Sequence, residues 1–192
     1  MATAGKISTL MVEALQRHGV NAVGLSGADG RLMVARRKET IRVVVDGKTL
    51  VLRDDHTGTI ESINERLLQH LLDDGYTPVV APLAISPQGE LVSVDADRAA
   101  AVLAAALGAE ALILLTNVPG LLARFPDEMT LISRLPREKL DDALSLAEGR
   151  MKKKVLGARA ALQRGVSRVV IADGRVASPV SAALAGRGTL IS

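Results

Sequence analysis

The sequence predicts an α/β fold, a three-layer αβα sandwich in which helices cover both faces of a mainly parallel sheet. Aliphatic strand-like runs alternate with amphipathic helical runs over all 192 residues, which is typical of such sheets. The composition is 48% hydrophobic but only 1% aromatic, so Leu, Val, Ile and Ala must form the core, which suits a sheet buried on both faces. No linker or repeat interrupts the chain. We therefore expect a single domain over residues 1–192.

The first half of the chain predicts two helices, several strands and a hairpin. One helix covers residues 6–18, ends at Gly19 and has the inward face Ile7, Leu10, Met11, Ala14 and Leu15. The other covers residues 60–73, with Ile63, Leu67, Leu68 and Leu71 inward. Strands are predicted at residues 20–25, 31–35, 41–45, 49–52 and 78–85. The turn signal Asp46-Gly47 predicts a β-hairpin near residues 41–52.

The second half continues the alternation of helices and strands. Helices are predicted at residues 97–107, 150–164 and 179–185, and a short one at 137–144 within a polar loop. Strands are predicted at 111–115 and 168–172, and the last residues, 188–191, resemble an edge strand. Gly108 and Gly165 follow two of these helices and are suitable C-terminal residues for them.

Composition excludes several classes of function. The chain has no Cys and only three scattered His, so we expect no disulfide and no protein metal site. It has no apolar run of the roughly 18 residues that a membrane span needs, and its first residues lack the apolar core of a signal peptide; we expect a cytoplasmic protein. The net charge of +3 fits an anionic ligand or acidic partner, whereas the scarcity of aromatic residues argues against nucleic acid.

The stretch from Gly89 to Leu122 contains the most suggestive chemistry. Asp95 and Asp97 stand just before and within the predicted start of an Ala-rich helix, where an aspartate commonly caps free backbone N–H groups. One helix needs only one such cap, so the second carboxylate could orient a lysine or hold a metal-bound nucleotide. Thr116–Gly120 follows a strand and is either an ordinary turn or a loop on the ligand side of the sheet.

Two basic clusters complete the candidates. Met151, Val155, Ala158 and Leu162 share one helical face, which places Lys153 opposite it and Lys152 and Lys154 beside it. Lysines near a helix N-terminus are unfavourable unless an anion such as phosphate offsets them, although plain solvation is the simpler alternative. Arg36–Lys38 is either a solubilising surface or a docking surface for an acidic partner. Neither GxxxxGK[ST] nor GxGxxG occurs, so a nucleotide would need another arrangement.

Taken together and in order, these segments resemble the amino acid kinase family, the acylphosphate-forming kinases that include acetylglutamate kinase. The segments that carry the resemblance are Ala4–Ile7, Ala22–Gly30, Asp95–Asp97, Gly108–Glu110, Thr116–Leu122, Met151–Val155 and Gly188-Thr189. Finer features resemble the branch that acts on amino-group carrier proteins in lysine biosynthesis, namely Gly30–Leu32, Arg36–Lys38, Val118–Glu128, Gly149–Lys154 and Ala172–Val176. The resemblance covers essentially the whole chain.

This resemblance implies an ATP- and Mg²⁺-dependent kinase. Its acceptor is implied to be a small acidic amino acid, aminoadipate or glutamate, linked to an acidic carrier protein that a basic surface at Arg36–Lys38 would suit. Acetylglutamate kinase and a non-catalytic nucleotide-binding remnant are the alternatives. The family tends to form homodimers.

The resemblance also implies roles for particular residues. Lys154 would stabilise charge on the transferred phosphoryl group, and Asp97 would hold the catalytic lysines by ion pairing. Ser93 and Asp95 would contact the substrate. The remaining positions, Thr116, Asn117, Gly120, Leu121 and Lys152, would contact the nucleotide. In such chemistry the protein mainly positions groups and neutralises charge.

Three departures qualify the resemblance. Ser93 stands where Asn is usual, and Arg98 where Gln is usual. The family's N-terminal Lys-x-Gly-Gly strand, glycine-rich loop and substrate-binding Arg have no counterpart in these 192 residues, so the chain resembles the C-terminal portion of the domain. Because one lost transition-state donor commonly costs about 10²–10³ in rate, we expect the isolated chain to be inactive or nearly so.

Overall fold

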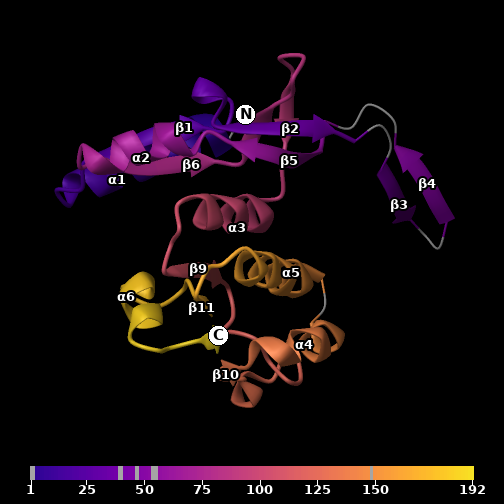
Figure 1. The fold of residues 1–192 in the computed structure, drawn as a ribbon. Coiled ribbons are helices and arrows are strands. Elements are labelled where there is room, and N and C mark those ends of the chain that lie inside the picture. The colour runs from indigo at the N-terminus through magenta and orange to yellow at the C-terminus, as the bar shows by residue number, and fades with distance from the viewer. Residues whose placement is uncertain (1–2, 39–40, 46–47, 53–55, 148) are drawn as a thin grey trace. The chain divides into compact units, whose positions relative to one another are not determined.

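The computed structural model describes residues 3–38, 41–45, 48–52, 56–147 and 149–192. For residues 41–45 and 48–52 only the backbone is described. The chain forms two compact units, residues 1–99 and 100–192, which are described separately; Figure 1 traces the elements by colour along the chain. Helices and mixed sheets alternate in both units, and the predicted α/β fold class is confirmed. The division leaves the single-domain expectation a prediction.

The first unit contains a parallel strand pair, a four-stranded sheet and a hairpin. Strands β1 (Ala22–Ser26) and β6 (Thr77–Ala81) pair in parallel. The larger sheet has the order β5-β2-β7-β8, formed by Gly58–Ile63, Met33–Arg37, Leu83–Ile85 and Leu91–Ser93. Strands β3 (Ile41–Val45) and β4 (Lys48–Leu52) form the predicted antiparallel hairpin. Its predicted turn, Asp46-Gly47, lies outside the described residues.

The first helix presents a different face from the predicted one. A π-helical turn, η1 (Thr3–Ile7), leads into α1 (Ser8–Arg17). Ile7, Leu10 and Met11 are each 52% exposed, whereas Ser8 is buried. A Cβ built at Gly24 of β1 would lie 3.1 Å from Ser8 Oγ and 3.2 Å from Val12 Cγ2. The small glycine thus lets the helix approach β1 on its Ser8 and Val12 side, which apolar periodicity alone could not show.

Two further predictions in this unit were wrong at their boundaries. Residues 60–63 belong to β5, and α2 (Glu65–Asp73) begins only after Asn64, whose side chain accepts a hydrogen bond from Leu67 N at 3.3 Å. Asn64 is therefore the N-cap, and the Thr and Ile residues before it suit a strand. The predicted strand 78–85 is divided at Pro82 into β6, which pairs with β1, and β7, which pairs with β2 and β8.

Smaller differences surround the second strand and the end of the unit. The 3₁₀ turn η2 (Asp29–Arg31) occupies the start of the predicted strand 31–35, so β2 begins two residues later. Strand β8 is too short for the alternation rule and was not predicted. Helix α3 (Ala96–Ala106) lies within one residue of its predicted bounds and continues into the second unit.

The second unit is a four-stranded sheet with helices on both faces. Its order is β10-β12-β11-β9, formed by Arg134–Leu135, Thr189–Ile191, Arg168–Asp173 and Ala111–Thr116. Strands β9 and β11 are parallel, as are β10 and β12, whereas β12 runs antiparallel to β11. The predicted edge strand is therefore wrong, since β12 has a neighbour on each side and Ile191 is fully buried. Two-residue β10 lay in a polar stretch without strand periodicity.

Side-chain alternation along these strands separates two apolar layers. Leu112, Leu114 and Ile171 belong to a large buried cluster with residues of α4 (Leu140–Leu146) and α5 (Gly149–Gln163). Ile113, Val170 and Ala172 pack with Ala183 of α6 (Pro179–Leu184) in a second cluster. The predicted inward face of α5 is confirmed, because Val155, Ala158 and Leu162 are buried. The 3₁₀ turns η3 (Glu128–Thr130) and η4 (Arg137–Lys139) complete the unit.

Candidate functional site

A pocket of about 360 Å³ lies in the second unit where β9 ends. It gathers residues from the segment after β9, the end of α4 and the start of α5. The lining residues are Thr116, Asn117, Val118, Gly120, Leu121, Leu122, Phe125, Leu146, Ala147, Gly149, Arg150 and Met151. Most of these side chains are apolar, so the pocket suits a largely apolar group.

A residue of β12 fixes the segment that follows β9. Leu121 N donates to Thr189 Oγ1 at 2.8 Å, and this bond is buried. A Cβ at Gly120 would lie 2.6 Å from the same hydroxyl and 2.8 Å from a methyl carbon of Leu131, so only glycine allows this approach. Ile132, eleven residues later, packs beside Leu121, and its N donates to Leu121 O at 2.9 Å. The wall containing Gly120 and Leu121 is therefore fixed by the sheet.

Another part of the lining is the N-terminal turn of α5. Gly149 has φ of +51°, a conformation that suits glycine, and Arg150 and Met151 follow in the lining. The buried Val155 and Ala158 fix the helix against the sheet. Free N–H groups at a helix N-terminus attract anions, and Arg150 adds a positive charge. This end of the pocket is thus suited to a phosphate or another anion.

The structure brings most of the predicted nucleotide contacts together. Thr116, Asn117, Gly120 and Leu121 all line the pocket. Lys152 is exposed and directly follows the lining residues of α5, and Lys154 is half-buried one residue beyond Lys153. Their contact with a nucleotide remains a prediction. Phe125, Leu146, Ala147, Arg150 and Met151 also line the pocket and were not predicted, although the basic run beginning at Arg150 indicated the start of this helix.

The predicted substrate residues lie in the first unit. Ser93 ends β8, is exposed and donates from its backbone N to His56 O at 2.6 Å. Asp95 precedes α3, and its Oδ1 accepts a hydrogen bond from Arg98 N at 3.2 Å. Asp97, in the first turn of α3, is half-buried. Asp97 and Lys154 belong to different units, and their ion pair stays a prediction.

Asp95 therefore performs the capping role, and its replacement tests that role. We expect Asp95→Ala to lower the free energy of unfolding by about 1 kcal/mol, because the N-terminal turn of α3 loses its side-chain acceptor. Asp95→Asn keeps an acceptor oxygen and should preserve most of this stability. Urea unfolding followed by circular dichroism measures both. Equal loss in the two variants would show that the charge, rather than the cap, matters.

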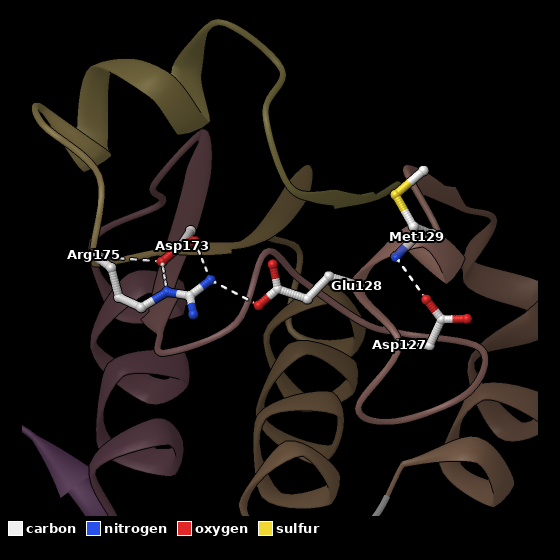
Figure 2. Close-up of polar contacts among 5 residues, drawn as sticks. All are labelled: Asp127, Glu128, Met129, Asp173 and Arg175. Atoms are coloured by element: carbon white, nitrogen blue, oxygen red, sulfur yellow. Dashed lines mark hydrogen bonds and ion pairs between the residues drawn. The ribbon is translucent and has the colours of Figure 1, made fainter.

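A charged cluster ties together two loops of the second unit (Figure 2). Arg175 donates from Nε to Asp173 Oδ1 at 2.8 Å and from Nη2 to Asp173 Oδ2 at 2.7 Å. The same Nη2 donates to Glu128 Oε1 at 3.0 Å. The hydrogen bonds from Arg175 hold the pKa of the Asp173 carboxyl below its usual range, although desolvation of the carboxyl opposes the shift. Asp173 and Glu128 in turn raise the pKa of the Arg175 guanidinium. The sequence indicated no role for this cluster.

Two features are absent from the residues that the structure describes. In those ranges no three His, Asp or Glu side chains lie close enough together to hold a metal ion. No described helix combines the length and apolar character needed to cross a membrane.

Comparison with known sequences identifies a family and close relatives. The amino acid kinase family matches residues 1–173. A [LysW]-aminoadipate kinase of Thermus thermophilus is 51% identical over all of this chain and 72% of its own length. One of Deinococcus radiodurans is 55% identical over all of this chain and 66% of its own length. An acetylglutamate kinase of Methanopyrus kandleri is 37% identical, with 74% of its length covered. The chain thus spans about two thirds to three quarters of these relatives.

Among solved structures, an N-acetylglutamate synthase from Neisseria gonorrhoeae, complexed with coenzyme A and N-acetyl-glutamate, has a similar fold. Its TM-score is 0.80 at 29% identity, and the similarity covers 98% of this chain and 42% of that one. The agreement extends over both compact units of the present structure.

Proposed function

The chain belongs to the amino acid kinase family, and we propose that it takes part in ATP-dependent phosphorylation of a side-chain carboxylate. The acceptor we propose is L-2-aminoadipate, or glutamate, attached to an acidic amino-group carrier protein. The observation that carries this proposal is the 51–55% identity to [LysW]-aminoadipate kinases over the whole chain. Identity to an acetylglutamate kinase is lower, at 37%.

The pocket after β9 supports the nucleotide part of the proposal. Leu121, Leu122 and Met151 offer apolar surface for the adenine ring. Arg150 and the N–H groups of the first turn of α5 would hold phosphate oxygens. Thr116 and Asn117 add polar groups to the lining. ATP supplies the phosphoryl group when bound, with Mg²⁺ neutralising part of its charge.

The proposed chemistry needs positive charge where the phosphoryl group is transferred. Lys154, on the same helix as Arg150 but farther from its N-terminus, would stabilise the charge that develops on the equatorial oxygens. Asp97 would orient Lys154 by ion pairing. Ser93 and Asp95 would hold the acceptor, with the short Ser93 hydroxyl in a place where the family usually carries an amide. Homodimer formation, usual in the family, is part of the same proposal.

A basic surface on β2 supports a carrier-protein partner. The Arg36 side chain is 77% exposed and pairs with Glu61 at 3.0 Å, and Arg37 pairs with Glu90 at 3.7 Å. The Arg36–Glu61 pair is exposed, and such pairs are worth little, so an acidic partner could exchange with Glu61 at small cost. Complementary charge mainly raises the rate of association, and binding of an acidic carrier should therefore weaken as salt is added.

Nucleotide binding provides the direct test of this function. We expect the chain to bind Mg-ATP in calorimetric titration, and Lys154→Ala to weaken binding by roughly 10- to 100-fold, as expected for loss of a charged hydrogen bond. The control is Lys153→Ala, because Lys153 is exposed on the side of α5 away from its buried face. No binding by the wild-type chain, or equal effects of the two substitutions, would contradict the proposal.

A second candidate is phosphorylation of free N-acetylglutamate, which the relationship to an acetylglutamate kinase favours. The two acceptors differ in what surrounds the reacting carboxylate: one is free and acetylated, the other is attached to a protein. Binding of each acceptor, measured calorimetrically in the presence of Mg-ATP, separates them and needs no turnover by this chain, which we expect to be nearly inactive. Binding of free N-acetylglutamate alone would favour the second candidate; nucleotide binding with neither acceptor bound would favour the third alternative, a non-catalytic nucleotide-binding chain.

A further inference from the structure

Two segments leave the sheet side by side at the pocket edge. Strands β9 and β11 are parallel and in register from Arg168 opposite Ala111 to Asp173 opposite Thr116. Gly174 N donates to Thr116 O at 2.7 Å, so the two chains remain in contact just beyond the strands. The segment after β9 forms a wall of the pocket, whereas the segment after β11 contributes no lining residue to it.

The pocket wall continues into a loop with its own internal structure. Leu122 and Leu131 form an isolated bridge, and Ala123 N donates to Thr130 O at 2.9 Å. Thr130 Oγ1 accepts from Arg124 N at 3.1 Å and donates to Asp127 O at 2.6 Å. These bonds shape residues 122–131 but do not attach the far end of the loop to the sheet. Phe125, which lines the pocket, lies at this far end and is 73% exposed.

Arg175 supplies that attachment. Its guanidinium grips Asp173 through two nitrogens and reaches Glu128, at the end of the loop, through Nη2. Figure 2 shows Glu128 directed toward Arg175, while Asp127 is directed the other way, toward Met129 N. We infer that Arg175 is a positioning residue of the proposed nucleotide pocket, which fixes the loop carrying Phe125 by clamping Glu128 to the end of β11. This inference rests on the proposed function.

Exposure decides what kind of effect the clamp has. The Arg175 and Glu128 side chains are each 50% exposed, whereas that of Asp173 is 16% exposed. Half-exposed ion pairs contribute little to global stability, but bidentate geometry fixes direction well. Removing the clamp should therefore leave the fold intact and increase the conformational freedom of the loop. A ligand that uses Phe125 must then pay the cost of ordering it.

The first experiment compares variants in ATP titration. Arg175→Ala and Glu128→Ala should each weaken Mg-ATP binding roughly 3- to 10-fold, the effect of ordering one or two extra side chains. The double variant should be no weaker than either single one, because both remove the same link. The matched control is Arg168→Ala, since Arg168 pairs with Glu110 at 2.8 Å at the opposite end of the same strands. It should bind ATP like wild type.

The second experiment needs no nucleotide. Hydrogen exchange of the free chain should be faster at the Ala123, Asp127 and Thr130 amides in Arg175→Ala and Glu128→Ala, and unchanged in Arg168→Ala. Unchanged exchange in both clamp variants overturns the inference, as does wild-type ATP affinity in Arg175→Ala. A wild-type chain that binds no ATP contradicts the proposed function instead, and the exchange rates alone then decide whether the clamp holds the loop.

Discussion

Replacing Gly188 with alanine is expected to lower the free energy of unfolding by roughly 2–6 kcal/mol. Gly188 has φ of +114°, which side chains rarely adopt, and a Cβ there would lie 2.4 Å from Ile171 O and 3.1 Å from Ala172 Cα. Both neighbours are backbone atoms of β11 and cannot move aside as a flexible side chain could. The conformational strain and the overpacking therefore add. Urea unfolding followed by circular dichroism measures the loss.

Gly186 is the matched control, two residues away in the same turn. Its φ is +88°, but a Cβ there would meet no atom within 4 Å. Gly186→Ala should therefore cost only the backbone strain, about 1–2 kcal/mol. Equal destabilisation by the two substitutions would show that the contact with β11 does not explain why residue 188 is glycine.

The elements that the sequence predicted best are those whose signals are local. Helix α5 and strands β9 and β11 each lie within one residue of their predicted bounds. An apolar stripe repeats along α5, and short aliphatic runs form the two strands, with Gly108 and Gly165 nearby as stops. These elements can be predicted without knowing their neighbours, because the apolar side chains that define the helical or strand periodicity are themselves the buried ones.

The errors arose where another part of the chain decides the outcome. Strand β12 has no edge character because β10, a two-residue strand in a polar stretch, covers it on one side. The exposed Leu10 and Met11 were expected inward, but Gly24 on a separate element brings Ser8 inward instead. Neither Gly24 nor β10 has a periodic signal, so no pattern within the helix or the last strand could have revealed them.

The candidate site shows the same division. The position of Thr116–Leu121 follows from one rule, that loops at the carboxyl ends of parallel strands lie on the ligand side, and all of these residues except Pro119 line the pocket. The Arg175–Glu128 contact joins residues 47 positions apart in sequence. Charged residues are common in loops, and sequence spacing gives no reason to pair these two.

Replacing Thr189 with valine is expected to damage both the fold and the proposed nucleotide pocket. Thr189 is fully buried, and its Oγ1 accepts the Leu121 N–H at 2.8 Å. Valine has nearly the same shape but no acceptor, so a buried N–H loses its partner at a cost of about 1–3 kcal/mol. The affected amide belongs to the pocket wall. We therefore expect weaker Mg-ATP binding together with a lower midpoint of urea unfolding.

Thr189→Ser separates the hydrogen bond from the packing. Serine keeps the hydroxyl and removes only a methyl group, which costs about 1 kcal/mol when buried. Both variants should be less stable than wild type, but only valine should weaken ATP binding in calorimetric titration. If serine weakened ATP binding as much as valine, packing around β12 rather than the Leu121–Thr189 hydrogen bond would explain how Gly120 and Leu121 are held in place. The donating N–H belongs to the peptide group that joins Gly120 and Leu121. Both residues line the pocket, so a shift of this peptide group moves two lining residues at once.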